Sequence, residues 1–148
     1  MSLVDQINAD ITTAMKAGEA DKLSVLRMAK TALMNKKIAV GHELSDDEAV
    51  AVLSKEAKQR RDSEAEFRAG NRPELADKEA AEAVMLTAYL PAQMDEAAVA
   101  QLVDAAIAET SATGADDMGK VMGALMPKTR GKADGAMVSR LVKERLGA

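Results

Sequence analysis

Hydrophobic residues recur at helical spacing along almost the whole chain of 148 residues. The first segment shows the pattern, because Leu3, Ile7 and Ile11 fall on one side of a helix that Gly18 would end. The same periodicity predicts seven helices, at residues 3–17, 22–40, 46–69, 74–90, 96–109, 118–126 and 136–146. No stretch alternates apolar and polar residues between turn signals, so the sequence predicts an all-α fold.

Residues of the types that start and stop helices stand at the ends of these segments. Ser45 and Glu48 match the capping box, in which the serine hydroxyl accepts a hydrogen bond from the Glu48 amide and the carboxylate reaches back to the serine amide. The other signals are caps at Asp21 and Asp95, glycine stops at Gly18, Gly41 and Gly70, and prolines at the start and end of the fourth helix, Pro73 and Pro91.

The most constrained stretch is residues 116–135, DDMGKVMGALMPKTRGKADG. Its apolar residues form one stripe, expected to be buried, that consists of Met118, Val121, Met122, Leu125 and Met126. Gly119 and Gly123 flank the stripe, where the missing Cβ would let another backbone approach, although each weakens the helix by about 0.8–1 kcal/mol relative to alanine. Pro127 is expected to end the helix, because it lacks a backbone donor.

The chain is expected to form two helical parts. Residues 90–93, LPAQ, interrupt the helical pattern, and we place the boundary there. The prediction is an N-terminal four-helix bundle over residues 1–91, followed by a small three-helix C-terminal domain over residues 92–148.

The composition narrows the function classes. Hydrophobic residues make up 47 % of the chain but aromatic residues only 1 %, so stacking platforms for single-stranded bases are missing. The chain has no cysteine, which is consistent with a reducing compartment, and we infer the cytoplasm. We find no secretory signal and no apolar run of about 20 residues, and therefore expect no membrane partner.

Charge is unevenly distributed in this acidic chain of net charge −4. Residues 1–90 carry 13 Lys and Arg against 16 Asp and Glu, and residues 91–115 carry four acids and no cation. Residues 116–148 reverse the balance, with seven cations against four acids. Only the last third is therefore cationic, which would attract a polyanion locally.

No group of residues matches a catalytic, metal or cofactor site. His42 is the only histidine, it lies in a predicted loop, and no serine is marked as its partner, so we expect no catalytic residue, no metal and no cofactor. The glycine–lysine pair at residues 131–132 fails the P-loop pattern, because the first glycine and the final Ser or Thr of that motif are missing. Asp116 and Asp117 fit caps of the sixth helix better than a metal or acid–base pair.

Cations gather around the turn that follows the sixth helix. The candidate nucleic-acid-binding residues, which could face one phosphate track, are Lys120, Lys128, Arg130, Lys132, Arg140 and Lys143. Gly131 and Gly135 are available for positive φ in the turn. The alternative interpretation is a solvated connector. The run at residues 58–61, KQRR, is a weaker candidate because neighbouring acids would neutralise it.

These stretches resemble the YqeY family, small proteins that share a C-terminal domain with the GatB subunit of the tRNA-dependent amidotransferase. The resemblance covers nearly the whole chain and is most specific at residues 117–135, with support from residues 14–28, the segment that ends at Ser63 and residues 87–94. It implies an N-terminal helical bundle and a three-helix tail similar to the part of GatB that touches tRNA. By the same resemblance, Lys120, Lys128, Arg130 and Lys132 would lie near the nucleic acid.

Three functions follow as hypotheses. The leading one is a non-catalytic helical module that binds structured RNA, tRNA above all, through a basic helix–turn–helix surface. The first alternative is a protein-binding adaptor with a groove formed by Met118, Met122, Met126 and Met137. The second is an amidotransferase-related factor, a carbon–nitrogen ligase with glutamine as amide donor, which only the family resemblance implies.

Overall fold

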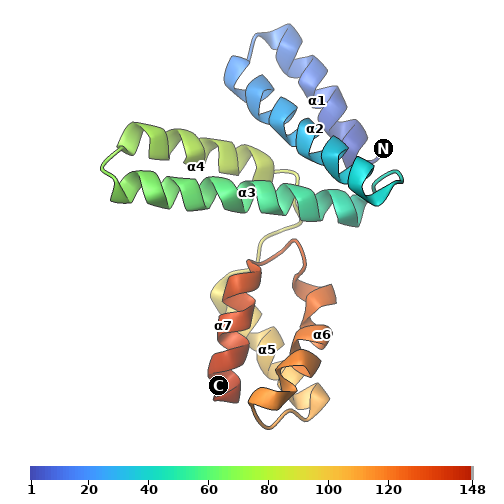
Figure 1. Cartoon of the computed structure of the whole chain (residues 1–148), viewed down its shortest axis with the longest axis vertical. Helices are drawn as coiled ribbons and strands as arrows, with labels where there is room; N and C mark the ends of the chain where they lie inside the picture. The colour runs from blue at the N-terminus through green and yellow to red at the C-terminus, as the bar shows by residue number, and fades with distance from the viewer. Residues whose placement is uncertain (148) are drawn as a thin grey trace. The chain divides into compact units, whose positions relative to one another are not determined.

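The computed structural model describes residues 1–147, in which all regular structure is helical and no strand occurs (Figure 1). The elements are α1 (Leu3–Ala17), α2 (Ala20–Val40), α3 (Asp46–Ala69), α4 (Pro73–Thr87), α5 (Glu96–Thr110), a 3-10 turn (Ala115–Asp117), α6 (Met118–Thr129) and α7 (Gly135–Leu146). The predicted all-α class is therefore confirmed for the described residues. The chain divides into two compact units, residues 1–90 and the residues from Pro91 onward.

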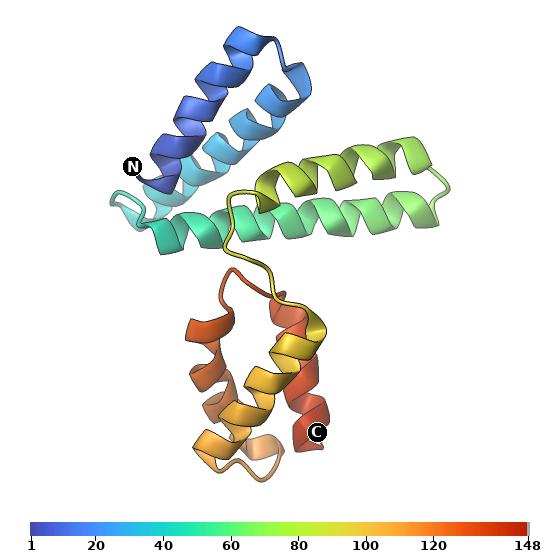
Figure 2. The same cartoon turned by 180° about the vertical axis from the view of Figure 1, so that it is seen from behind.

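The N-terminal unit consists of two helical hairpins. Helices α1 and α2 form one hairpin and α3 and α4 the other, and α2 packs on both α3 and α4 (Figure 2). Their buried faces supply one apolar core, whose fully buried members include Ile7, Leu26, Leu53 and Leu86. Small residues such as Ala57 are also fully buried, which allows the helices to approach closely without aromatic side chains.

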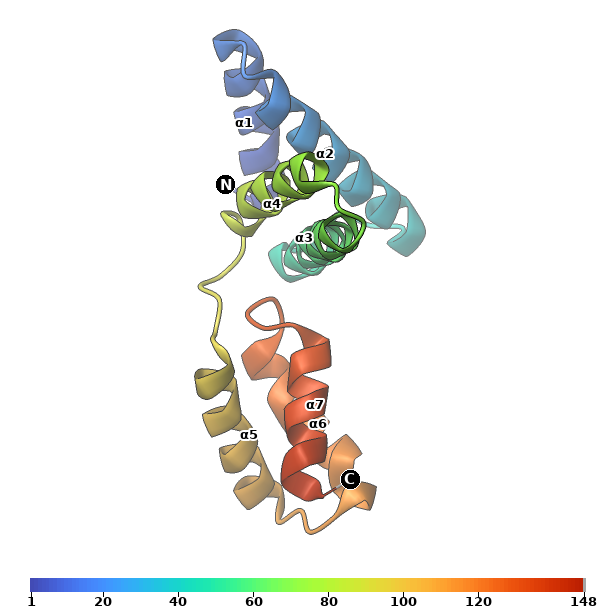
Figure 3. The same ribbon diagram turned by 90° about the vertical axis from the view of Figure 1, so that its left-hand side faces the viewer.

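The C-terminal unit has a separate core of three helices. Helix α5 packs on α6 and α7, and these two pack on each other (Figure 3). Val103, Val121, Leu125 and Val142 are fully buried at the centre. Met126 was expected in this core, but its side chain is 40 % exposed, so the buried stripe of α6 is narrower than predicted.

Most helix starts follow the signals in the sequence. The Ser45 capping box is present, with the Glu48 amide donating to Ser45 Oγ at 3.2 Å and the Ser45 amide donating to Glu48 Oε1 at 3.2 Å. Pro73 occupies the first turn of α4, and Asp95 Oδ1 accepts from the Ala98 amide at 2.8 Å. Asp21 does not cap α2, because the helix begins at Ala20, two residues earlier than predicted, and Asp21 lies in its first turn.

Two helix ends differ from the prediction. Helix α4 ends at Thr87, since the amides of Tyr89 and Leu90 bond three residues back and the residue before Pro91 is disfavoured in helical geometry. Pro127 does not end α6, which continues to Thr129. The extra turn is held by Thr129, whose buried hydroxyl donates to the Leu125 carbonyl at 3.2 Å.

Asp117 and Gly135 also differ from their predicted roles. Asp117 does not cap α6 with its side chain; instead, its carboxylate accepts from the amide and hydroxyl of Thr113 at 2.9 and 3.3 Å. The hydrogen bond from the Thr113 amide lowers the pKa of Asp117, so this carboxylate stays ionised and closes the loop before the helix. Gly135 has no positive φ, because it begins α7 after the cap Asp134.

Candidate nucleic-acid interface

The turn between α6 and α7 is fixed by the segment that precedes α5. Gly131 adopts φ 75°, the left-handed conformation expected for it. Its carbonyl accepts from the side-chain amide of Gln93 at 2.8 Å, and the Lys132 carbonyl accepts from the Met94 amide at 2.8 Å. Gln93 donates also to the Pro91 carbonyl at 2.8 Å, so one side chain joins both segments. The turn is thereby held through its own carbonyl groups. The side chains of Arg130 and Lys132 take no part in these hydrogen bonds and are exposed.

Gln93, Met94 and Thr129 are site residues that the sequence did not reveal. The segment at residues 87–94 was predicted to hold the boundary between the two helical parts and to match the family pattern, but nothing local to it indicates a contact with a turn almost 40 positions later. A proline followed by a side-chain amide was the only available signal, and that pair occurs in many loops.

The six candidate cations fall into three groups according to their partners. Lys120 lies 3.6 Å from Asp117, and Lys128 lies 3.8 Å from Glu109. Both lysines are exposed and both separations are long, so these ion pairs contribute little and open easily. Lys120 and Lys128 therefore stay accessible to a phosphate.

Arg140 is held more firmly than the lysines. Its guanidinium contacts Glu96 closely and also donates to Glu144 Oε1 at 3.1 Å. The hydrogen bond to Glu96, followed by the one to Glu144, raises the pKa of Arg140. Because Glu96 begins α5 and Arg140 lies on α7, the pair links these helices, and a phosphate would have to displace two carboxylates.

Arg130, Lys132 and Lys143 form the third group. All three are exposed, and no carboxylate of residues 1–147 forms an ion pair with any of them. Lys143 lies eight residues after Gly135 on α7, about 12 Å along the helix axis. The charges of these three side chains are thus uncompensated by the protein, which is the state that favours a bound polyanion.

The two glycines of α6 lie on an open surface. Within the chain, a Cβ placed on Gly119 or Gly123 would meet nothing within 4 Å, so the close backbone approach expected there is not made by any described part of the chain. Both glycines are exposed. Their cost in helix stability is therefore not offset by packing inside the protein.

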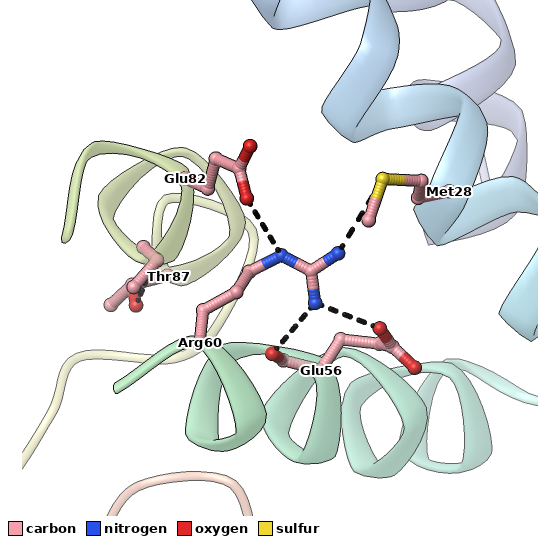
Figure 4. A network of polar contacts seen from close by, with 6 residues as sticks. Met28, Glu56, Arg60, Glu82 and Thr87 are labelled. Atoms are coloured by element: carbon pink, nitrogen blue, oxygen red, sulfur yellow. Dashed lines mark hydrogen bonds and ion pairs between the residues drawn. The ribbon is translucent and has the colours of Figure 1, made fainter. Parts of the chain in front are cut away.

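In the weaker basic run of the N-terminal unit, residues 58–61, both arginines form contacts within the unit. Arg60 is only 5 % exposed, and it donates to the Glu56 carbonyl at 3.0 Å and to Glu56 Oε2 at 2.9 Å, while its Nε lies 3.6 Å from Glu82 (Figure 4). Its other terminal nitrogen points at the sulfur of Met28, 3.9 Å away. The neighbouring Arg61 donates to Thr87 Oγ1 at 2.8 Å. The run thus joins α2, α3 and α4.

The remaining candidate chemistry is simple. His42 is exposed; its Nδ1 lies 2.8 Å from the Glu43 carbonyl and its Nε2 lies 3.8 Å from Glu48. No serine hydroxyl among residues 1–147 bonds to it. The same residues contain no group of three or more His, Cys, Asp or Glu side chains placed to hold a metal ion. A search of the described helices for one that could cross a membrane finds none.

These features define a class of helical protein in which a three-helix unit presents a fixed, cationic turn. The chain belongs to the YqeY-like protein family, whose model matches residues 4–146, and the resemblance predicted from the sequence is thereby confirmed. It is also similar to a fungal protein from Pyrenophora tritici-repentis (strain Pt-1C-BFP), "Altered inheritance of mitochondria protein 41, mitochondrial". The two are 27 % identical over 150 residues, which cover 99 % of this chain and 82 % of the fungal protein.

Proposed function

We propose that this protein is a non-catalytic module that binds structured RNA, with tRNA as the first candidate. The binding surface, named here the basic turn surface, consists of Arg130, Lys132 and Lys143, with Lys120 and Lys128 at its margin. The observation that carries the proposal is that Arg130, Lys132 and Lys143 have no acidic partner among the described residues, although the chain as a whole has a net charge of −4. Arg140 is left out, because two carboxylates already hold it.

The turn geometry supports binding to the RNA backbone. Because Gln93 and Met94 fix the main chain of the turn, little main-chain entropy is lost when Arg130 and Lys132 bind phosphates. Double-stranded RNA is recognised largely by shape and by phosphate and 2′-hydroxyl contacts, which need no aromatic side chains. The family resemblance to the tail of GatB that touches tRNA supports tRNA as the ligand.

The proposal holds for more than one compartment. The name of the fungal relative assigns that protein to mitochondria, and the absence of cysteine here is consistent with any reducing compartment. We propose the cytoplasm for this chain. Neither alternative function gains a specific observation: Met118, Met122 and Met137 pack against the core of the C-terminal unit rather than line a free groove, and the comparisons name no amidotransferase activity.

The decisive experiment measures tRNA affinity in a charge-reversal variant. Arg130→Glu, Lys132→Glu and Lys143→Glu together should weaken binding by at least about a hundredfold, because each phosphate contact is replaced by repulsion. The matched control is Lys16→Glu, Lys55→Glu and Lys78→Glu, which has the same net charge but changes exposed lysines of the N-terminal unit. Its affinity should fall only slightly.

Two further measurements of tRNA affinity test the proposal, one of its salt dependence and one of a Gln93 variant. With three to five phosphate contacts, the logarithm of affinity should fall with that of salt concentration at a slope of about −2 to −4, and the slope should shrink in the triple variant. Gln93→Ala should reduce affinity several-fold without a change in charge, because it frees the turn. Equal tRNA affinity of the native protein and the Arg130, Lys132 and Lys143 variant would refute the proposed function.

A further inference from the structure

A pocket of about 340 Å³ lies beside the α1–α2 hairpin of the N-terminal unit, a region that the proposed function does not use. It is bordered by α1, by α2 and by the loop that leads to α3. Its apolar lining consists of Val4, Ile7, Leu33, Met34 and Leu44. Ile7 and Leu33 belong to the buried core, so the pocket reaches down to the core of this unit.

Large apolar side chains continue from the pocket onto the surface. Met34 is 53 % exposed and lines the pocket, and Ile38, one helical turn further along α2, is 76 % exposed. Single exposed apolar residues are common on soluble proteins and need no explanation. Two of them in sequence beside an apolar hollow form a continuous patch, which is typical of a surface that another molecule covers.

A buried polar atom in the pocket has no partner. Asn8 lines the pocket, and its Oδ1 is inaccessible to solvent and forms no hydrogen bond within the described residues. Buried acceptors of this kind normally have a donor. Because this atom is inaccessible, a bound molecule would satisfy it only after the Asn8 side chain turns toward the pocket.

The edge of the patch is basic, although the unit as a whole is acidic. Arg27 and Lys30 lie on the same side of α2 as Met34 at helical spacing, both are exposed, and neither has a carboxylate partner among residues 1–147. Lys37 also lines the pocket, but Glu43 already contacts it. Asp5 also lines the pocket, where its carboxylate accepts from the Ser2 amide. Three cations, Arg27, Lys30 and Lys37, therefore face two acids, Asp5 and Glu43, and the excess positive charge favours an acidic partner.

We propose that this surface, the α1–α2 groove, binds an acidic amphipathic α-helix of a partner protein. Apolar residues of that helix, spaced i, i+3 or i+4 and i+7, would contact Met34 and Ile38 and enter the pocket, in the helix-in-groove manner. Its flanking carboxylates would pair with Arg27 and Lys30. A concave apolar site suits the ridge of a helix better than a flat membrane surface, and it offers no phosphate track for RNA.

Three synthetic peptides of about 18 residues test the proposal against the full chain by fluorescence polarisation. The first carries leucines at i, i+3, i+4 and i+7 with glutamates on the other positions, the second replaces every glutamate by lysine, and the third scrambles the first. The glutamate peptide should bind at least about tenfold more tightly than either of the others. Its binding should shift the NMR signals of Leu33 and Leu44, which line the pocket.

Two exposed substitutions separate the groove from the rest of the surface. Ile38→Glu should weaken the glutamate peptide by about tenfold or more, because it places a carboxylate in the apolar patch and opposes the acidic partner. Val84→Glu is the matched control: Val84 is 70 % exposed on α4 and does not line this pocket. Val84→Glu should leave the peptide affinity unchanged, and neither substitution should change the affinity for tRNA.

Asn8→Leu tests the unpaired acceptor. It should raise the thermal midpoint of the free protein, since it removes an unsatisfied polar atom, and yet weaken peptide binding several-fold. The proposal is overturned if the scrambled peptide binds as well as the glutamate peptide, or if Ile38→Glu and Val84→Glu behave alike. A membrane interpretation predicts a different result. The proposal is also overturned if the protein sediments with phosphatidylserine vesicles in a way that depends on Ile38 while the glutamate peptide shows no saturable binding.

Discussion

At the residue scale, Gly119 and Gly123 lower the stability of α6 relative to alanine, and such a loss of stability can indicate a function. Each lies on an exposed side of α6 with free space around the position of a Cβ, and neither adopts positive φ. Nothing in the described chain therefore requires glycine at either position. Under the proposed function, close approach of an RNA backbone to this side of α6 would explain both glycines.

Replacing these glycines should separate stability from binding. Gly119→Ala and Gly123→Ala should each increase the free energy of unfolding by about 0.5–1 kcal/mol, because alanine loses less backbone entropy in a helix. Affinity for tRNA should fall in the same variants if the RNA backbone contacts α6. Chemical denaturation and a binding titration measure the two effects, and unchanged affinity in the double variant would remove α6 from the contact surface.

Glu48 gives a residue-scale prediction of pH dependence. The Ser45 amide donates to its carboxylate and lowers the pKa of Glu48 below the ordinary value of 4.5. A folded-state pKa below the unfolded value means that the capping box stabilises the protein above about pH 4.5, and that this contribution is lost as the pH falls through the folded-state pKa. Glu48→Gln should therefore flatten the fall in stability below pH 4.5.

The control for Glu48 lies in the same helical turn. Asp47→Asn removes a carboxylate that takes no part in the capping box, so it should keep the acid-dependent loss of stability. Thermal unfolding monitored between about pH 3 and pH 7 compares the three proteins. If Asp47→Asn flattens the profile as much as Glu48→Gln, the helix dipole rather than the capping box is responsible.

The residues that the sequence predicted best are those whose partners are near in sequence. Ser45 and Glu48 are three positions apart, and both hydrogen bonds of the box are present. Ser2 and Asp5, also three positions apart, form a second box that was not predicted. Partners far apart in sequence, such as Asp10 and the Tyr89 hydroxyl, left no local signal.

At the element scale, the two hairpins of the N-terminal unit meet around a buried arginine. Arg60 lies on α3, contacts Glu82 on α4 and points at Met28 on α2 (Figure 4). One cation thus stands between the carboxylates of Glu56 and Glu82, both of which are largely buried. Removal of the arginine would leave these two acids without compensation.

Arg60→Ala should therefore destabilise the N-terminal unit by about 3–5 kcal/mol, measured by denaturant unfolding. Arg60→Met combined with Glu56→Gln and Glu82→Gln should recover most of that loss, because no uncompensated charge is left. Methionine keeps much of the bulk of the arginine side chain, so the combined variant isolates charge compensation. If it is as unstable as Arg60→Ala, the hydrogen bonds of the guanidinium, rather than compensation of the two acids, account for the loss.

Helix boundaries were less predictable than helix positions, and α6 shows the reason. Pro127 is a strong stop signal, yet α6 runs on to Thr129, because burial of Thr129 and its hydrogen bond to the Leu125 carbonyl come from the tertiary fold. Arg140 was counted with the free cations for a similar reason. Its partner Glu96 lies 44 positions away, a distance over which periodicity carries no information.

At the scale of the whole molecule, two separate cores suggest that the two units are domains. The cluster around Leu53 includes only residues of α1–α4 among its buried members, and the cluster around Leu125 includes only residues of α5–α7. No buried residue belongs to both clusters. We therefore expect each unit to unfold by its own cooperative transition, so that the basic turn surface and the α1–α2 groove can be altered independently.

Two core substitutions in the full chain test this expectation. Leu53→Ala should lower the stability of residues 1–90 by about 2–5 kcal/mol and leave amide exchange in residues 91–147 unchanged, whereas Leu125→Ala should do the reverse. Below the unfolding transition, Leu53→Ala should also retain native tRNA affinity. Because distant sites that share no contacts contribute additively, the double variant should show both losses without interaction. A single transition, shifted by either substitution and accompanied by faster exchange in both units, would show instead that the chain folds as one cooperative body.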